Sequence, residues 1–412
     1  MSQPLSQLEL QGQEDLTYGD IVWGQYKKNK LAYLSLWGVG GLFALAIFAP
    51  VIASTRPFIW STAEGMTFPW FTSLFDRNYY ENAVDIFFNL WLVFGIPLTV
   101  AWWGYVQRMQ KSGLQKRPRR RKMIKAMGGC ISVFLLTFVF ILAKPHAEPY
   151  RMFVEEYEAA QEAGEDVKAL FPPIRYSARQ TGFRPLEKPS KQHVLGVDQS
   201  TRDVAVRLLY GTRISLSIGV IAVSIYVTIG IILGATAGFF GGWVDIGIQR
   251  LIEVTMCVPS LFVILTLVAF VEEPSIFHIM IIIGLVRWTG VARLTRGEYL
   301  RLRSLDFVTA ARALGYPRRR IIFQQILPNA LGPVLVAAPF GVASAILFEA
   351  TLSFLGLGDV SAPSWGQTLQ EGYASGSWHL ILAPGFAIFV TVFLLNVAGE
   401  ALRDALDPKM RK

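Results

Sequence analysis

The stretch DFVTAARALGYPRRRIIFQQILPNA, residues 306–330, lies between two long apolar runs and decides how the rest of the sequence is interpreted. It is basic, it contains two adjacent alanines, and a glycine and two prolines punctuate it. The flanking runs have about the length that a helix needs to cross a bilayer, roughly 20 residues. A membrane protein that is interrupted in this way must use the segment for something other than spanning.

The overall composition is that of an integral membrane protein. Of 412 residues, 52% are hydrophobic and 17% are charged, whereas soluble domains average about 25% charged residues. The mean hydropathy is +0.40. The net charge of +9 is better explained by its position around the spans than by nucleic-acid binding, so we expect no nucleic-acid partner.

The sequence carries no motif that indicates catalysis. It contains no P-loop, no His-Glu-x-x-His motif and no Gly-x-Ser-x-Gly elbow. These motifs would have indicated ATP binding, a metal centre and a serine nucleophile. We therefore expect that this chain is not an enzyme and uses no cofactor or metal.

Eight apolar runs are candidate transmembrane helices, and the third and sixth are the shortest. They cover residues 31–54, 83–106, 126–143, 213–239, 251–271, 275–291, 331–355 and 379–399. The expected fold class is an all-α integral membrane protein with about eight transmembrane helices.

Lysine and arginine residues determine the expected orientation, because they are enriched in cytoplasmic loops. Basic clusters lie before the first run, in the loops 108–125 and 293–320, and in the C-terminal sequence DPKMRK. Residues 144–212 instead carry the acidic run VEEYEAAQEAGED. With eight spans, every basic segment falls on the cytoplasmic side. We expect both termini in the cytoplasm and residues 144–212 outside.

The quoted stretch predicts two short helices joined by a turn. Asp306 can cap the first helix by accepting hydrogen bonds from the amides that follow it. Gly315 suits the left-handed position that ends a helix. Pro317 suits the first turn of the second helix, and Pro328 is expected to interrupt that helix.

The first of these helices has little side-chain bulk, which favours docking to a cytoplasmic partner. Ala310, Ala311 and Ala313 leave its surface open to close approach, and Arg312 adds charge. A DNA-binding helix-turn-helix has a similar outline, but a span on each side leaves no room for the rest of such a domain. A purely interfacial helix would carry large apolar residues along one face.

The stretch resembles the cytoplasmic coupling loop of permease subunits in binding-protein-dependent ABC importers. In that family the loop begins Glu-Ala-Ala and ends Ile-x-Leu-Pro, and here Thr309 and Gln325 stand where Glu and Ile are usual. The resemblance implies that the first helix sits in a cleft of a separate ATPase subunit. The candidate coupling residues are Asp306, Thr309, Ala310, Ala311, Arg312, Gly315, Leu327 and Pro328.

Further motifs resemble the peptide and nickel branch of this family, and its oligopeptide and dipeptide permease C subunits in particular. HVLGVDQSTRDVAVRLLYGTRISL (193–216) is similar to an external motif of that branch, in which Asp198, Arg202 and Asp203 match and Thr201 replaces a glycine. TLSFLGLGDVSAPSWGQTL (351–369) and LRDALDPKMR (402–411) are similar to two more of its signatures.

The resemblance implies a type I ABC importer permease core with two extra helices inserted after the first span. The expected organisation is a cytoplasmic segment 1–30, a first span 31–54, an insertion 55–192 and a core 193–412. The insertion holds two candidate spans and an external loop. The core contains the coupling loop 293–330.

The implied function is to form half of the translocation pathway for peptides, with oligopeptides favoured, in a bacterial inner membrane. The implied partners are two ABC ATPase subunits, a second related permease, an external solute-binding protein and the lipid bilayer. One alternative is an importer of nickel or another small solute from the same branch. A standalone channel or secondary transporter is an alternative of a different class.

Glu349 is the acidic residue nearest the outer end of its span, and an intramembrane acid is a functional hypothesis. Two interpretations remain open from the sequence. The carboxylate can be interfacial and bonded to backbone or water, or it can face the substrate pathway near the amino terminus of a peptide. Elsewhere in the spans, Gly234 and Gly238 predict close helix packing, and Pro259 predicts a kink.

Overall fold

The computed structural model describes residues 18–63, 65–111, 116–143 and 151–406, and it is mostly helical. The helices are α2 (Tyr18–Lys28), α3 (Lys30–Ile52), α4 (Pro69–Ser73), α5 (Ala83–Leu90), α6 (Ile96–Lys111), α7 (Lys116–Ala143), α8 (Phe153–Glu162), α9 (Val204–Phe240), α10 (Gly242–Met256), α11 (Ser260–Ala269), α12 (Ile276–Val286), α13 (Trp288–Leu302), α14 (Asp306–Ala313), α15 (Arg318–Arg320), α16 (Leu327–Phe354), α17 (Trp365–Ser375) and α18 (Trp378–Leu406). Two π-helical segments, η1 (Trp91–Gly95) and η2 (Ile321–Ile326), join α5 to α6 and α15 to α16.

Seven helices in the described residues are long and apolar enough to cross a membrane, and a bent pair brings the number to eight. This agrees with the expected eight spans. The seven are Lys30–Ile52, Ala83–Met109, Lys122–Ala143, Val204–Phe240, Ile276–Leu302, Arg318–Phe354 and Trp378–Leu406. Several extend beyond the apolar runs, so the expected loop 293–330 is helical at both of its ends.

The predicted span 251–271 is the one that differs most from the structure. α10 and α11 occupy this region and meet at an angle of 78°. Pro259 precedes the first residue of α11 with an extended backbone (φ −57°, ψ 128°), so it separates two helices instead of kinking one. Its missing N–H removes a backbone donor that a continuous helix would need.

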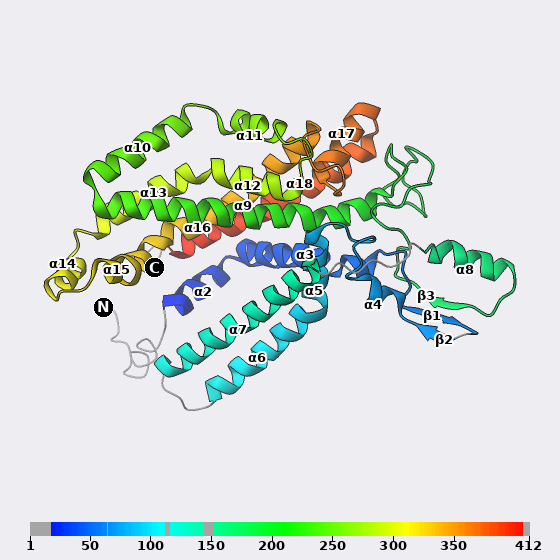
Figure 1. Cartoon of the computed structure of the whole chain (residues 1–412), viewed down its shortest axis with the longest axis horizontal. Coiled ribbons are helices and arrows are strands. Elements are labelled where there is room, and N and C mark those ends of the chain that lie inside the picture. The colour runs from blue at the N-terminus through cyan, green and yellow to red at the C-terminus, as the bar shows by residue number, and fades with distance from the viewer. Residues whose placement is uncertain (1–17, 64, 112–115, 144–150, 407–412) are drawn as a thin grey trace, which may run out of the picture.

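The two ends of the helical bundle differ in what they carry (Figure 1). At one end, the loop end, lie α14, α15, α2 and the C-terminal end of α18. At the other, the sheet end, lie α8 and three strands, β1 (Ile59–Thr62), β2 (Gly65–Thr67) and β3 (Lys168–Leu170). The strands form an antiparallel sheet of order β2-β1-β3, which the sequence did not predict.

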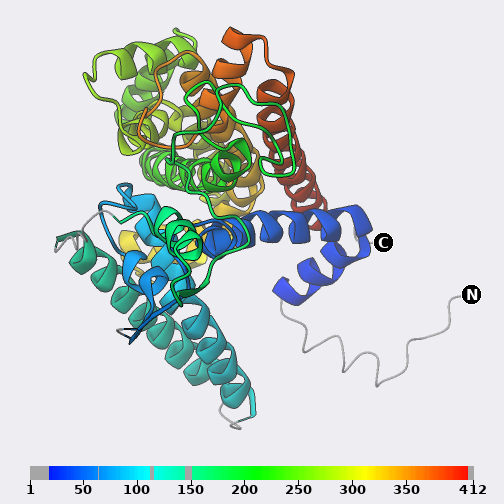
Figure 2. The ribbon, with the colours of Figure 1, turned by 90° about the vertical axis from the view of Figure 1, so that its right-hand side faces the viewer.

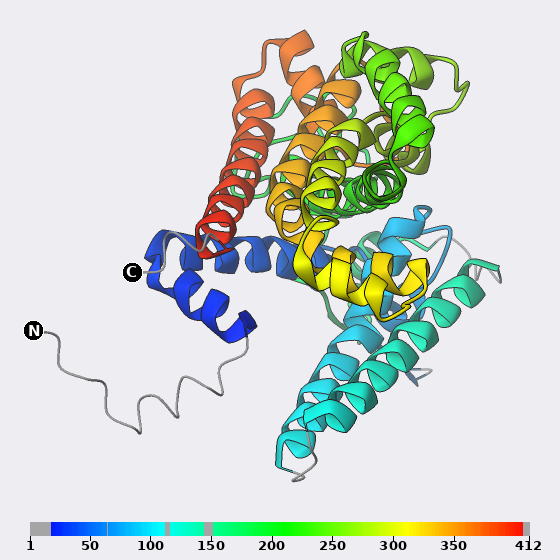
Figure 3. The same cartoon turned by 90° about the vertical axis from the view of Figure 1, so that its left-hand side faces the viewer.

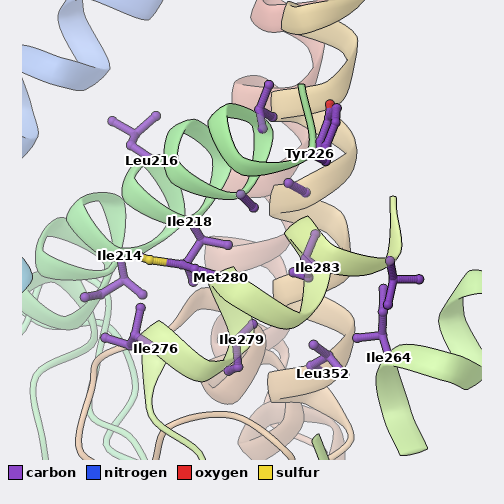
Figure 4. Close-up of a cluster of buried hydrophobic side chains, with 14 of the residues drawn as sticks. Ile214, Leu216, Ile218, Tyr226, Ile264, Ile276, Ile279, Met280, Ile283 and Leu352 are labelled. Atoms are coloured by element: carbon purple, nitrogen blue, oxygen red, sulfur yellow. The ribbon is translucent and has the colours of Figure 1, made fainter. Parts of the chain in front are cut away.

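The 37-residue helix α9 is the centre of the core. It lies against α12, α13 and α16, and its glycines allow the closest approach. A Cβ atom added at Gly234 would lie 2.4 Å from the carbonyl oxygen of Ala292, and one at Gly238 would lie 2.5 Å from the Cβ atom of Tyr299. The expected close packing at these glycines is confirmed. Nearer the N-terminus of α9, Ile214 and Ile218 pack with Met280 of α12 (Figure 4).

The inserted spans form a hairpin that diverges from the other helices toward the loop end (Figures 2 and 3). Only 6% of the apolar stretch within Lys122–Ala143 is buried inside the structure. Near the sheet end, the hairpin is attached to the core through α5. Arg213 of α9, which is fully buried, donates to Asp85 Oδ1 at 3.0 Å and to Asn89 Oδ1 at 2.9 Å.

Candidate coupling loop and external motif

The segment between α13 and α16 is tied to the ends of the core helices. Arg303 follows α13 and donates from Nη1 to the carbonyl oxygen of Gly238 at 2.8 Å, which satisfies a free carbonyl at the end of α9. Tyr299 of α13 donates to the carbonyl oxygen of Ile322 at 3.2 Å. These bonds join the segment to the end of α9 and join α13 to η2, which leads into α16.

α14 has an inner and an outer face. Val308 and Ala311 are buried and pack with Tyr299, Leu302 and other apolar residues of the loop end. Thr309, Ala310 and Ala313 are exposed. The outer face therefore presents small side chains next to the exposed Phe307 and Leu314, and the inner face fixes the helix to the core.

A Schellman motif ends α14. Gly315 has φ +73°, its N–H donates to the Arg312 carbonyl, and the N–H of Tyr316 donates to the Ala311 carbonyl. The predicted role of Gly315 is thus confirmed. The predicted cap at Asp306 is wrong, because Asp306 is the first helical residue and no side chain caps this helix.

Pro328 does not interrupt the second helix, contrary to expectation. Arg318–Phe354 is continuous, and the π-helical segment η2 precedes the proline. Pro328 is the second residue of α16 and follows η2 almost directly, so a π-helical turn accommodates the proline inside the continuous helix, and Leu327 begins α16. Pro317 precedes the first residue of α15, one position before the site predicted for it.

Two arginines around α14 lie over aromatic rings. Arg312 lies 6.0 Å from the ring centroid of Phe239, and Arg320 lies 4.0 Å from that of Tyr316. Arg312 and Arg320 are exposed. The outer surface of the loop is therefore positively charged around a patch of small residues, which suits a complementary protein surface.

The external motif forms a buried charge network at the opposite end of α9. Asp198 is fully buried and accepts hydrogen bonds from the backbone N–H and the Nε atom of Arg202, each at 2.8 Å. Arg202 also donates to Glu371 Oε1 at 2.8 Å. Arg207 Nε lies 3.3 Å from Asp198 Oδ2. The network joins α17 to the segment that precedes α9.

Burial dominates the electrostatics of Glu371 in this network. It raises the pKa of the carboxyl group, and the neighbouring Asp198 raises it further. Arg207 and Arg202 act in the opposite direction, because a nearby cation favours the ionised carboxylate.

Asp203 caps α9 and accepts from the N–H of Val206 at 2.9 Å. Its other oxygen lies 2.8 Å from Nδ1 of His193, and both side chains are buried. Thr201 has φ +64°, in the region where the glycine of related sequences is favourable. The turn thus keeps a glycine-like conformation despite the substitution.

Glu349 is enclosed by hydroxyl groups. It is 1% exposed and accepts hydrogen bonds from Ser364 at 2.7 Å, from Ser353 at 2.8 Å and from Ser215 at 3.4 Å. Neither interpretation from the sequence describes this arrangement, because the partners are side chains and the carboxylate does not reach a surface. In this conformation no solute can contact it.

Three charged residues in the spans were not singled out from the sequence as intramembrane charges. Asp85 and Arg213 form the buried pair described above, and Arg287 lies within the span Ile276–Leu302. The available signal was the presence of charges inside apolar runs. No group of three or more His, Cys, Asp or Glu residues suited to a metal ion occurs in the part of the chain that the structure describes.

Comparison with known families and proteins agrees with this architecture. Residues 230–412 match the family described as "Binding-protein-dependent transport system inner membrane component", and residues 17–67 match "N-terminal TM domain of oligopeptide transport permease C". Most of the insertion lies outside both ranges.

Three related proteins cover most of their own length in the match. The dipeptide transport system permease protein DppC of Alkalihalophilus pseudofirmus is 39% identical over 250 residues, 59% of this chain and 82% of that protein. The oligopeptide transport system permease protein OppC of Haemophilus influenzae is 45% identical over 223 residues, 53% of this chain and 71% of that protein. The DppC protein of Bacillus subtilis is 35% identical over 315 residues, 74% of this chain and 89% of that protein.

The identity and coverage of these matches, together with the apolar helices and the loop between α13 and α16, lead to one assignment: the chain belongs to the family of binding-protein-dependent transport system inner membrane components, in the branch of oligopeptide and dipeptide ABC transporter permeases.

Proposed function

We propose that this chain forms half of the translocation pathway of an ABC importer for peptides and couples it to separate ATPase subunits through α14. Permeases of this family are multi-pass inner-membrane proteins, and ATP hydrolysis belongs to other subunits. The complete transporter would contain two ABC ATPase subunits, a second permease and an external solute-binding protein. The peptide substrate is inferred from the names of the related permeases.

The two-faced structure of α14 is the observation that carries the coupling proposal. Val308 and Ala311 anchor the helix to the core, while Thr309, Ala310 and Ala313 leave the opposite face accessible. A cleft of an ATPase can approach the helix closely at these small residues, and the exposed Phe307 and Leu314 beside them offer apolar contacts. Movement of the ATPase would then reach α9 and α16 through the hydrogen bonds described above.

The proposed orientation has the loop end in the cytoplasm and the sheet end outside. The basic loop 293–320 and the C-terminal end of α18 then lie together on the cytoplasmic side, as the distribution of lysine and arginine favours. The buried network of Asp198, Arg202 and Asp203 would lie outside, where it holds α9 and α17 in a fixed relation.

The substitution Ala310→Trp tests the coupling proposal. Tryptophan fits the exposed outer face without disturbing the buried one, but it fills the space that a docking cleft needs. We expect peptide uptake by the reconstituted transporter to fall by about tenfold or more, the equivalent of about 1.4 kcal/mol of lost docking energy. The ATPase subunits should also dissociate more easily during purification.

Ala159→Trp is the matched control, because Ala159 is an exposed alanine on α8 at the opposite end of the molecule. It should leave uptake and subunit composition unchanged. Full uptake and normal ATPase retention by Ala310→Trp would refute docking through this face. Loss of the Ala310→Trp permease itself from the membrane fraction, together with the ATPase, would instead indicate a folding defect. The amount of inserted permease measures this directly.

A further inference from the structure

Arg287 is a cation near the middle of a membrane span. It separates α12 from α13 with a backbone that departs from helical geometry (φ −95°, ψ 6°), inside the 27-residue span Ile276–Leu302. Non-helical backbone at membrane depth is tolerated where it is buried in protein or lines a water-filled cavity. The position therefore combines two features that are costly in contact with lipid.

The guanidinium group of Arg287 has no anionic partner within the described residues. It lies 4.7 Å from the ring centroid of Phe348 on α16, and no hydrogen bond or ion pair joins the guanidinium group to the described part of the chain. Glu349 follows Phe348 directly, but its carboxylate is bonded to serine hydroxyls. An aromatic ring stabilises the cation through one face and leaves its N–H edge available.

Packed aromatic residues lie on one side of Arg287. Trp288 beside it is buried in the same apolar cluster as Tyr226 of α9. The hydroxyl group of Tyr226 occupies the space over Gly341 of α16, where an added Cβ atom would lie only 1.6 Å away. Arg287 itself is half-buried. One side of the cation is thus held by the core, and the other is open.

We propose that Arg287 binds the carboxylate of a peptide as it passes through the membrane. The planar N–H fork of arginine matches a carboxylate with two parallel hydrogen bonds, and every linear peptide with a free carboxyl terminus carries such a group. Exposure of the cation to lipid would be costly, so the open side of Arg287 faces the pathway. This inference rests on the proposed function as a peptide importer.

The test compares uptake of one peptide with a free carboxyl terminus and of its C-terminal amide by the complete transporter in liposomes. Arg287→Met removes the charge and keeps much of the length, and Arg287→Lys keeps the charge. We expect Arg287→Met to lower uptake of the free acid by about tenfold, the effect of one charge-assisted hydrogen bond of roughly 1.5 kcal/mol, and to leave uptake of the amide unchanged. Arg287→Lys should retain an intermediate rate for the acid.

Arg301→Met is the matched control, since Arg301 is an exposed arginine in the last turn of α13 and is paired with Glu298. Arg301→Met should change neither the uptake of the free acid nor that of the amide. Equal loss of acid and amide uptake in Arg287→Met would overturn the proposal, because it would indicate a structural role or an ion pair with the second permease. An unchanged acid rate would overturn it as well. Failure of the unmodified transporter to take up any peptide would refute the proposed function itself.

A photoreactive benzoylphenylalanine in place of Phe348 shows directly whether a peptide or the second permease contacts the open side of Arg287. Illumination during transport should join position 348 to a labelled peptide. Cross-linking to the second permease alone, with none to peptide, would assign the open side of Arg287 to a subunit interface and overturn the proposal.

Discussion

Glu349 illustrates how a single residue can be noticed in the sequence while its partners stay unpredicted. Its position in an apolar run identified it as unusual, but its partners come from three separate elements, α9, α16 and the segment before α17. Serine side chains at such distances in sequence cannot be paired without the fold. By contrast, the conformation of Gly315 depends only on its immediate neighbours, and the sequence predicted it correctly.

We predict that Glu349 stabilises the contact between α9, α16 and the segment before α17 and does not bind substrate. Glu349→Ala would leave the buried hydroxyl groups of Ser353 and Ser364 without an acceptor, at a cost of about 2 kcal/mol or more in the free energy of unfolding. Glu349→Gln keeps an acceptor oxygen and should cost roughly 1 kcal/mol. Thermal unfolding of the purified variants in detergent measures both effects.

The apparent affinity for peptide in the Glu349→Gln transporter separates the two roles. If Glu349 has only a structural role, the Glu349→Gln transporter should bind peptide with the same affinity as the unmodified protein. A clearly weaker affinity with unchanged thermal stability would show that the carboxylate contacts substrate and would contradict the interpretation from the structure.

At the scale of elements, the positions of spans were predictable and their ends were not. Apolar runs identified seven helices and the bent pair, but polar residues continue several of these helices beyond the membrane-length segment. α13 and η2 extend into the basic loop because Tyr299, Leu302 and Ile321 bury their side chains against each other there. Hydropathy carries no information about such packing outside the bilayer.

The contact between α9 and α13 gives a prediction at this scale. Gly234→Ala places a methyl group 2.4 Å from the Ala292 carbonyl oxygen, which forces the helices apart. We expect a loss of about 1–3 kcal/mol in stability, seen as a lower unfolding temperature. This exceeds the gain of about 1 kcal/mol that alanine normally brings to a helix.

Gly297→Ala on α13 provides the control for this prediction, because a Cβ atom there meets nothing within 4 Å. It should leave the unfolding temperature unchanged or raise it slightly. Equal responses of the Gly234 and Gly297 variants would mean that the two helices do not approach as closely as described.

At the scale of the whole molecule, the insertion is the part that the sequence explained least. The family matches stop at residue 67 and resume at residue 230, and the motif that resembles known permeases begins only at residue 193, so resemblance gave no guide to most of the insertion. The small sheet and the attachment of α5 through Arg213 depend on contacts between residues more than 100 positions apart. The core, whose motifs are local, was predicted far more completely.

We predict that the Arg213–Asp85 pair holds the insertion to the core. Asp85→Ala leaves a fully buried guanidinium group without its anion, which should lower stability by about 3–5 kcal/mol. Limited proteolysis should then release fragments of the insertion. Glu81→Ala is the control: its partner Arg179 and Glu81 itself are partly exposed, so a loss of about 1 kcal/mol or less is expected. Similar losses in both variants would contradict a special role for the buried pair.

The central claim is that this chain is a transport subunit that works with a separate ATPase. Gentle solubilisation from its own host, followed by mass spectrometry of the proteins that co-purify, tests it most directly. A P-loop ATPase and a second permease of the same family should be present in the purified complex. Recovery of the chain alone, with uptake that an ion gradient can drive, would instead identify a secondary transporter.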